Sequence, residues 1–117
     1  MKTLYLIGGT MGVGKTTISR QLKKDLHNSV FLDGDWCWDA DPFQLTEETK
    51  EMVMRNICFL LNNFLRCTAY DNIILCWVMH EQYIIDTLFR ILYATVDLYA
   101  KSFLIALRLA ITGFFDP

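Results

Sequence analysis

Residues 9–16 have the types and spacing that bind phosphate. They fit G-x-x-x-x-G-K-[ST] without a substitution, and in this pattern the glycines let successive backbone N–H groups point at phosphate oxygens. The lysine reaches the β- and γ-phosphates, and the threonine hydroxyl ligates Mg²⁺. The sequence therefore predicts a nucleotide site, whose members are Gly9, Thr10, Met11, Gly12, Val13, Gly14, Lys15, Thr16 and Thr17.

The segments on either side of this loop have the pattern that the motif requires. Residues 3–7 form an apolar, β-prone run that is typical of a buried strand. After the loop, Ile18, Leu22 and Leu26 recur at helical spacing. A strand, a glycine loop and a helix in this order distinguish a phosphate-binding loop from a chance match, and the start of the helix favours an anion.

An acidic pair, Asp33 and Asp35, follows the second predicted strand, residues 29–33. Ligands of open α/β sheets bind at the carboxyl ends of the strands, so we expect this pair to share a crevice with Lys15. Asp33 suits the role of a base or of a carboxylate linked to the metal, and Asp35 suits contacts to acceptor hydroxyls. The alternative is that both residues only build a tight turn, in the turn-like stretch of residues 34–42.

Three further side chains are candidates for an acceptor site, and each has a structural alternative. Trp36, with Trp38 close by, could form the wall of a pocket or could pack into the core. Arg55 could neutralise a phosphate or carboxylate, or could be a solvated surface residue. His80, after the third predicted strand, could line the site or cap the next helix.

The remaining pattern predicts one α/β domain over residues 1–117. Thr46 is the expected N-cap of an amphipathic helix, residues 72–78 form a strand that is apolar on both faces, and another helix begins near Glu81. Alternating strands and helices of this kind give a parallel sheet with helices on both faces. Residues 93–111 are nearly all apolar, and their periodicity fits either a buried helix or a strand plus a helix.

Composition excludes few protein classes here. The formal net charge of -2 gives no electrostatic reason to expect a nucleic acid or an anionic membrane as partner. The apolar runs are too short to span a bilayer. The four cysteines contain no C-x-x-C pair and no export signal is evident, so we expect reduced thiols and a cytoplasmic protein.

On these residues the chain resembles the small P-loop nucleotide and small-molecule kinases, a superfamily that includes adenylate, shikimate and gluconate kinases. It looks most similar to bacterial proteins described as nucleotide kinases or AAA-family ATPases. The resemblance rests on residues 9–17, 31–38, 42–43, 46–50 and 77–81 and covers about residues 1–88. It implies ATP and Mg²⁺ as cofactors and transfer of the γ-phosphoryl group to a small acceptor, such as a nucleoside or nucleotide.

Residues 89–117 form an atypical apolar tail that departs from this family. The family continues with a fourth strand, a lid that carries arginines and an adenine-contacting loop, and we match none of these to the tail. We therefore expect a P-loop NTPase-like domain that is shortened and lacks the usual lid. Lid arginines stabilise the transferring phosphoryl group, so the alternative function is nucleotide binding with impaired catalysis. The tail could also join two copies of the chain as a homodimer.

Overall fold

The computed structural model describes residues 2–8, 14–77, 82–95 and 104–110. The strands and helices alternate along this part of the chain, as the sequence pattern predicts. In order, the elements are β1 (Thr3–Gly8), α1 (Lys15–Asp25), β2 (Ser29–Asp33), the 3₁₀-helix η1 (Gly34–Trp38), α2 (Glu47–Arg66), β3 (Asn72–Trp77), α3 (Gln82–Thr95) and β4 (Leu104–Ala110).

The four strands form one parallel sheet in the order β2-β3-β1-β4. The prediction of a parallel sheet flanked by helices is confirmed. For the tail, the sequence pattern of residues 93–111 fits either a buried helix or a strand plus a helix, and it matches no fourth strand of the family. The structure corrects this: α3 continues to Thr95, and Leu104–Ala110 pairs with β1 as a fourth strand. Pairing with β1, rather than any local signal, distinguishes this strand.

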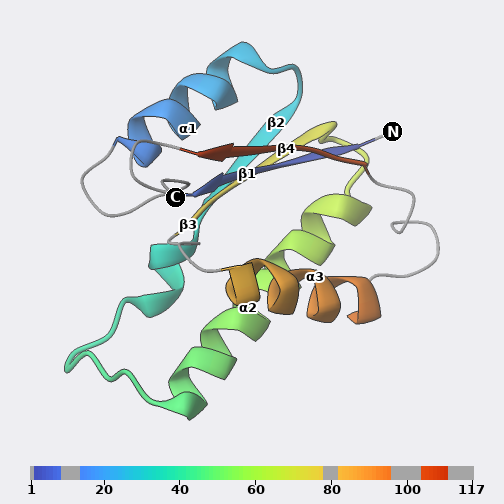
Figure 1. The fold of residues 1–117 in the computed structure, drawn as a ribbon. Coiled ribbons are helices and arrows are strands. Elements are labelled where there is room, and N and C mark those ends of the chain that lie inside the picture. Colours follow the sequence, from blue (N-terminus) through green and yellow to red (C-terminus); the bar gives the residue numbers. More distant parts are fainter. Residues whose placement is uncertain (1, 9–13, 78–81, 96–103, 111–117) are drawn as a thin grey trace.

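The helices lie on both faces of the sheet. Figure 1 shows α1 on one face and α2 and α3 on the other. From β1 the chain crosses β3 to reach β2, whereas the next two connections run the opposite way across the sheet. Crossovers between parallel strands are right-handed, so a reversal of direction requires the connecting helix to change face. The strand order therefore fixes which helices cover which face.

Alternate side chains of the strands divide the core into two clusters. On β3, Ile74 and Cys76 belong to a small cluster against which Leu22 of α1 packs. Their neighbour Leu75 belongs to a larger cluster that includes Val53 of α2. Because the side chains of a strand alternate between faces, a strand covered on both sides is apolar throughout. This explains the unbroken apolar run of β3.

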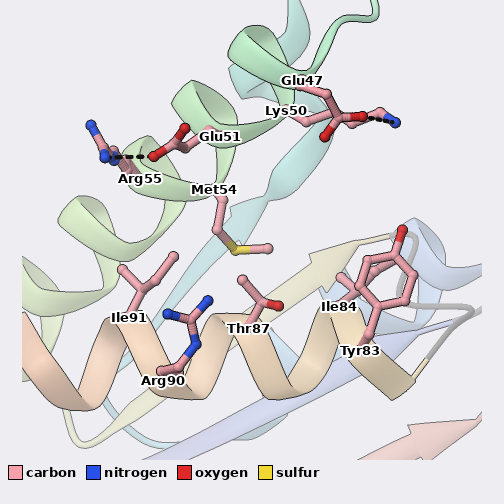
Figure 2. A pocket seen from close by; sticks show the side chains of 10 residues that line it. All are labelled: Glu47, Lys50, Glu51, Met54, Arg55, Tyr83, Ile84, Thr87, Arg90 and Ile91. Atoms are coloured by element: carbon pink, nitrogen blue, oxygen red, sulfur yellow. Dashed lines mark hydrogen bonds and ion pairs between the residues drawn. The ribbon is translucent and has the colours of Figure 1, made fainter.

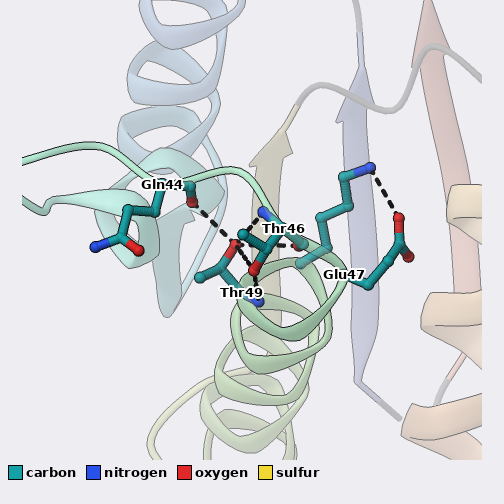
Figure 3. Close-up of polar contacts among 5 residues, drawn as sticks. Gln44, Thr46, Glu47 and Thr49 are labelled. Carbon is teal, nitrogen blue, oxygen red and sulfur yellow. Dashed lines mark hydrogen bonds and ion pairs between the residues drawn. The ribbon is translucent and has the colours of Figure 1, made fainter.

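A capping box fixes the start of α2 at the residue that the sequence predicts. The Thr49 N–H donates to Thr46 Oγ1 at 3.1 Å, and the Thr46 N–H donates to Thr49 Oγ1 at 2.8 Å (Figure 3). Thr49 Oγ1 also lies 2.9 Å from the carbonyl oxygen of Gln44, which joins the preceding loop to the helix. Glu47 and Glu48 occupy the first turn, where the helix dipole favours negative charge. The cap thus sets which α2 side chains face the core.

The length and composition of a helix decide whether it could span a membrane. The longest helix, α2, has 20 residues, and Glu51, Arg55 and Asn56 are exposed on it. A bilayer span needs about 20 consecutive, predominantly apolar residues. Within the described ranges, no helix has the length and hydropathy for such a span.

Candidate active site

The predicted phosphate-binding loop leaves the carboxyl end of β1 and enters α1. Residues 9–13 and the side chain of Lys15 lie outside the described part of the chain, so the two ends of the loop define its place here. Gly14, at the second end, has φ 91° and ψ 16°, a left-handed conformation that favours glycine. As the N-cap of α1, Gly14 has no side chain to bind the first N–H groups of the helix. Those donors therefore suit an anion.

Asp33 ends β2 at the same edge of the sheet. It is paired with Cys76 of β3, and Cys76 is paired with Ile7 of β1. Neighbouring strands lie about 4.8 Å apart, so the backbones of Asp33 and Ile7 are separated by about 10 Å. The residue is only 9% exposed. The sheet therefore brings a nearly buried carboxylate and the start of the phosphate loop to one edge.

The Asp33 carboxylate also has a structural task. Its Oδ1 accepts a hydrogen bond from the Asp35 N–H at 2.9 Å, which caps η1. The sequence predicted a turn-like stretch from residue 34, whereas the structure has a 3₁₀-helix over Gly34–Trp38. The turn-building alternative and the catalytic hypothesis for Asp33 are therefore compatible, because the cap uses one oxygen and holds the carboxylate in a single orientation.

Close packing between η1 and β3 supports this segment, and sequence reasoning missed it. A Cβ atom on Gly34 would lie 2.4 Å from the Cγ and Cδ1 atoms of Trp77. Glycine is therefore required here by space, whereas at Gly14 a Cβ would meet nothing within 4 Å and only the backbone conformation requires it. The two residues are far apart in sequence, and no local pattern signals the contact between them.

The two tryptophans of η1 separate into different environments. Trp36 is 55% exposed, and its ring meets the edge of Phe31 at a centroid distance of 5.4 Å. Phe31 belongs to the cluster beneath α1, so Trp36 lies on the α1 side of the sheet edge. Trp38 is half-buried and packs against the larger cluster and against Phe43. The two alternatives were packing into the core and forming the wall of a pocket. Trp38 packs into the core, whereas Trp36 is exposed next to the exposed Asp35, as a pocket wall would be.

Arg55 lies apart from the acidic segment. It is exposed on α2, and its Nη2 contacts Glu51 Oε1 at 2.5 Å. It lines a groove between α2 and α3, and no residue of β2 or η1 contributes to that groove. Exposed pairs of this kind contribute little to stability. His80, the other candidate for the acceptor site, lies outside the described residues.

The charge of Asp33 affects the neighbouring thiol. Burial raises the pKa of Cys37, and the Asp33 carboxylate raises it further. A raised pKa keeps Cys37 protonated at neutral pH, so it is a poor nucleophile. In the described ranges, no three histidine, cysteine or carboxylate side chains gather as a metal cage. The metal ligands predicted from the sequence are Thr16, which is half-buried at the start of α1, and Asp33.

The strand order, the glycine that precedes α1 and the motif between β1 and α1 together define a P-loop domain of the kinase type. More particularly, the chain belongs to the AAA domain family, whose model matches residues 6–110. The resemblance to P-loop kinases is thus confirmed. The family match continues beyond residue 88, the end of the resemblance seen in the sequence, and it includes β4.

The known proteins that are similar to this chain include several kinases. Shikimate kinases from two strains of Bacillus anthracis are 36% identical over 87 residues, which are 74% of this chain and 46% of theirs. The chain therefore spans about half the length of the curated relatives it matches. A variant of the Mycobacterium tuberculosis APS kinase has a TM-score of 0.64 at 17% identity, covering 99% of this chain and 79% of that one. A sugar kinase from a Janibacter species has a TM-score of 0.58 at 20% identity, covering 77% and 54%. At such identities the structures show a common fold alone.

Proposed function

We propose that this protein binds ATP with Mg²⁺ and transfers the γ-phosphoryl group to a hydroxyl of a small molecule. The observation that carries the proposal is the nearly buried Asp33 carboxylate at the sheet edge from which the phosphate loop leaves. A carboxylate held near a phosphate-binding loop can receive the proton of an attacking hydroxyl. The shikimate kinase relatives support the same reaction class.

Each predicted residue has a role in this reaction. The loop N–H groups and Lys15 hold the phosphates, Thr16 supplies a hydroxyl oxygen that Mg²⁺ prefers, and Asp33 is linked to the metal through a bound water, which leaves its carboxylate able to accept a proton. When bound, Mg²⁺ neutralises charge on the β- and γ-phosphates. The acceptor oxygen bonds to the γ-phosphorus, the bond to the β-phosphate oxygen breaks, and ADP leaves. Asp33 takes the proton of the acceptor hydroxyl.

The acceptor is proposed to lie against Asp35 and Trp36. An exposed indole next to an exposed carboxylate suits a molecule with hydroxyl groups and an apolar face, because the ring offers a flat apolar surface. A nucleoside, a nucleotide or a ring acceptor such as shikimate, after which the relatives are named, has this character. Arg55 and His80 are proposed as more distant contacts of the acceptor.

A second candidate function is nucleotide binding without efficient transfer. After residue 88 the sequence has only two arginines, Arg90 and Arg108. Arg90 lines the groove between α2 and α3, and Arg108 belongs to β4. Arginines that approach the transferring phosphoryl group can raise the rate by several orders of magnitude, so their lack would leave a protein that acts by binding or assembly.

ADP formation distinguishes the two candidates. The assay measures ADP release with ATP and Mg²⁺, with and without shikimate, sugars, nucleosides and nucleotides. ADP release that depends on one acceptor supports the kinase. Tight binding of ATP without turnover supports the second candidate. Failure to bind ATP would contradict both, since each depends on the phosphate loop.

Location and assembly complete the proposal. We propose a cytoplasmic protein, which is supported by four cysteines that are all free thiols. We also propose that residues 89–117 join two copies of the chain. Analytical ultracentrifugation of the chain over a range of concentrations tests this, and a monomer at every concentration would contradict it.

A further inference from the structure

A groove between α2 and α3 is lined by side chains that, apart from Arg55, have no role in the proposed phosphoryl transfer. Its volume is about 630 Å³, which is within the usual range for small-molecule sites. Residues of the first turns of α2 and of most of α3 line it (Figure 2). Among the described residues, none of β2 or η1 lines it, and Arg55 is the one described member that the sequence had assigned to the acceptor.

The charges of the α2 wall balance one another. Lys50 Nζ lies 3.4 Å from Glu47 Oε1, and Arg55 Nη2 lies 2.5 Å from Glu51 Oε1 (Figure 2). Both are pairs between successive turns of one helix. This wall therefore presents two cations and two anions, with no net charge towards the groove.

Arg90 gives the groove an excess positive charge. It comes from α3, and its guanidinium extends across the groove towards Met54 of α2 (Figure 2). The two ion pairs among the lining residues use Lys50 and Arg55, and neither includes Arg90. Asp86, one turn earlier on α3, is not a lining residue. The described lining residues therefore include one cation more than anions.

The surroundings of Arg90 suit an anion with an apolar body. Tyr83 and Thr87 precede Arg90 by seven and three positions, so they share one face of α3, and their hydroxyls can donate hydrogen bonds. Met54 and Ile84 supply apolar surface within the same groove. A guanidinium next to such surface binds a carboxylate or a phosphate through two parallel N–H donors.

We propose that this groove is a binding site for a small molecule that carries a carboxylate or phosphate on an apolar body, separate from the nucleotide. The anionic group contacts Arg90 and Thr87, and the apolar body lies against Met54 and Ile84. A monoanion matches the single excess positive charge of the described lining, whereas a dianion would leave one negative charge without a partner in the groove. The carboxylate form is therefore the favoured ligand.

Two probes with the same apolar body test the proposal. Binding of benzoate and of phenyl phosphate to the full chain is measured by isothermal titration calorimetry at low salt. A non-hydrolysable ATP analogue with Mg²⁺ is present at saturation, so that the phosphate loop is filled. Benzoate should bind more tightly than phenyl phosphate, and Arg90→Gln should weaken its binding by about tenfold, the usual effect of losing a bidentate charged contact.

Two further variants should affect probe binding differently. Glu51→Gln removes negative charge from the opposite wall, so it should tighten the binding of both probes. The matched control is Arg20→Gln, which removes the same charge as Arg90→Gln from an exposed position of α1, on the other face of the sheet. It should leave binding unchanged.

Three results would overturn the proposal. The first is that neither probe binds to the parent chain. The second is an equal loss in Arg90→Gln and Arg20→Gln, which would show a response to net charge alone. The third is tight binding of phenyl phosphate that Arg90→Gln does not change, which would mean that the anion binds elsewhere.

Circular dichroism of each variant verifies folding. Arg90→Lys keeps the positive charge but lacks the two parallel N–H donors of the guanidinium, so it should show an intermediate loss of binding. Binding of the ATP analogue itself is recorded separately and tests the proposed function.

Discussion

At the scale of the residue, Asp33 combines structure and chemistry. Its Oδ1 accepts the Asp35 N–H, its position in β2 is fixed by pairing with β3, and its charge raises the pKa of Cys37. A carboxylate that is held by a hydrogen bond and by a sheet loses less freedom when it meets a substrate. One oxygen of Asp33 is therefore held in the cap, and the negative charge of the carboxylate stays at the edge of the sheet.

Asp33→Asn separates the two tasks. The amide oxygen still accepts the Asp35 N–H, so folding and nucleotide binding should be kept, whereas loss of the charged base should slow transfer by about a hundredfold or more. Acceptor-dependent ADP release and nucleotide affinity are measured together. Asp39→Asn, an exposed change at the end of η1, is the control and should transfer at the parent rate. Transfer by Asp33→Asn at the parent rate would remove the catalytic assignment.

At the scale of the element, two contacts hold the helices that surround the site. The 3₁₀-helix η1 rests on Trp77 because Gly34 has no side chain. Helices α2 and α3 are joined by the Cys58 thiol, which donates to the Leu88 carbonyl at a distance of 3.7 Å. Burial raises the pKa of Cys58 to about 11. Neither contact involves residues that are neighbours in the sequence.

Gly34→Ala should destabilise the protein through steric overlap. Adding a Cβ at 2.4 Å from the Trp77 ring forces η1 away from β3, and overpacking of this kind costs about 1–3 kcal/mol. Urea unfolding of the parent, the single variants Gly34→Ala and Trp77→Leu, and the double variant measures the coupling. The cost of Gly34→Ala should be smaller when Trp77 is already Leu. Additive costs would show that the contact is not the cause.

The buried Cys58 thiol should make stability depend on alkaline pH. Its pKa rises from 9.0 to about 11 on folding, so the folded state retains the proton more strongly than the unfolded state. The resulting stability is fully present below pH 9.0 and is lost as the pH rises through about 11. Cys58→Ala should cost about 1–2 kcal/mol at neutral pH and less at alkaline pH.

Urea unfolding at several pH values tests this prediction. The control is Val53→Ala, which truncates a buried side chain without a titrating group on the same helix, so its cost should not follow this pH dependence. Parallel pH profiles for the two variants would contradict the role of the Cys58 thiol.

At the scale of the whole molecule, the strand order contains the reversal at which ligands of open α/β sheets usually bind. Strands β1 and β3 are neighbours, yet α1 follows β1 on one face and α3 follows β3 on the other (Figure 1). Adjacent strands whose connections leave towards opposite faces open a crevice at their carboxyl ends. The phosphate loop begins at this point, and Asp33 is on the next strand.

Nucleotide binding should stabilise the whole domain through this crevice. A non-hydrolysable ATP analogue with Mg²⁺ at a hundredfold excess over Kd should add about 2.7 kcal/mol to the free energy of unfolding. Lys15→Ala should abolish this gain, because the lysine holds the phosphates. Thermal unfolding with and without the analogue measures it. Lys24→Ala, an exposed change in the last turn of α1, should keep the full gain, and an equal loss in both variants would contradict the prediction.

The sequence by itself determined the phosphate-binding motif and most of the elements. The motif at residues 9–16, the strand at residues 29–33 and the cap at Thr46 depend on short-range spacing and local hydrogen bonds, which a sequence shows directly. The parallel sheet followed from the alternation of strands and helices. These features have in common that their physical causes lie within a few residues of one another.

Only the tertiary structure decided the rest. It assigned Leu104–Ala110 of the ambiguous tail to β4, separated the exposed Trp36 from the half-buried Trp38, and brought Gly34 against Trp77. It also located Arg55 in a groove with Arg90. Each of these outcomes depends on which distant segments meet. Burial, strand pairing and close approach are properties of contacts between segments, and the order of residues along one segment does not contain them.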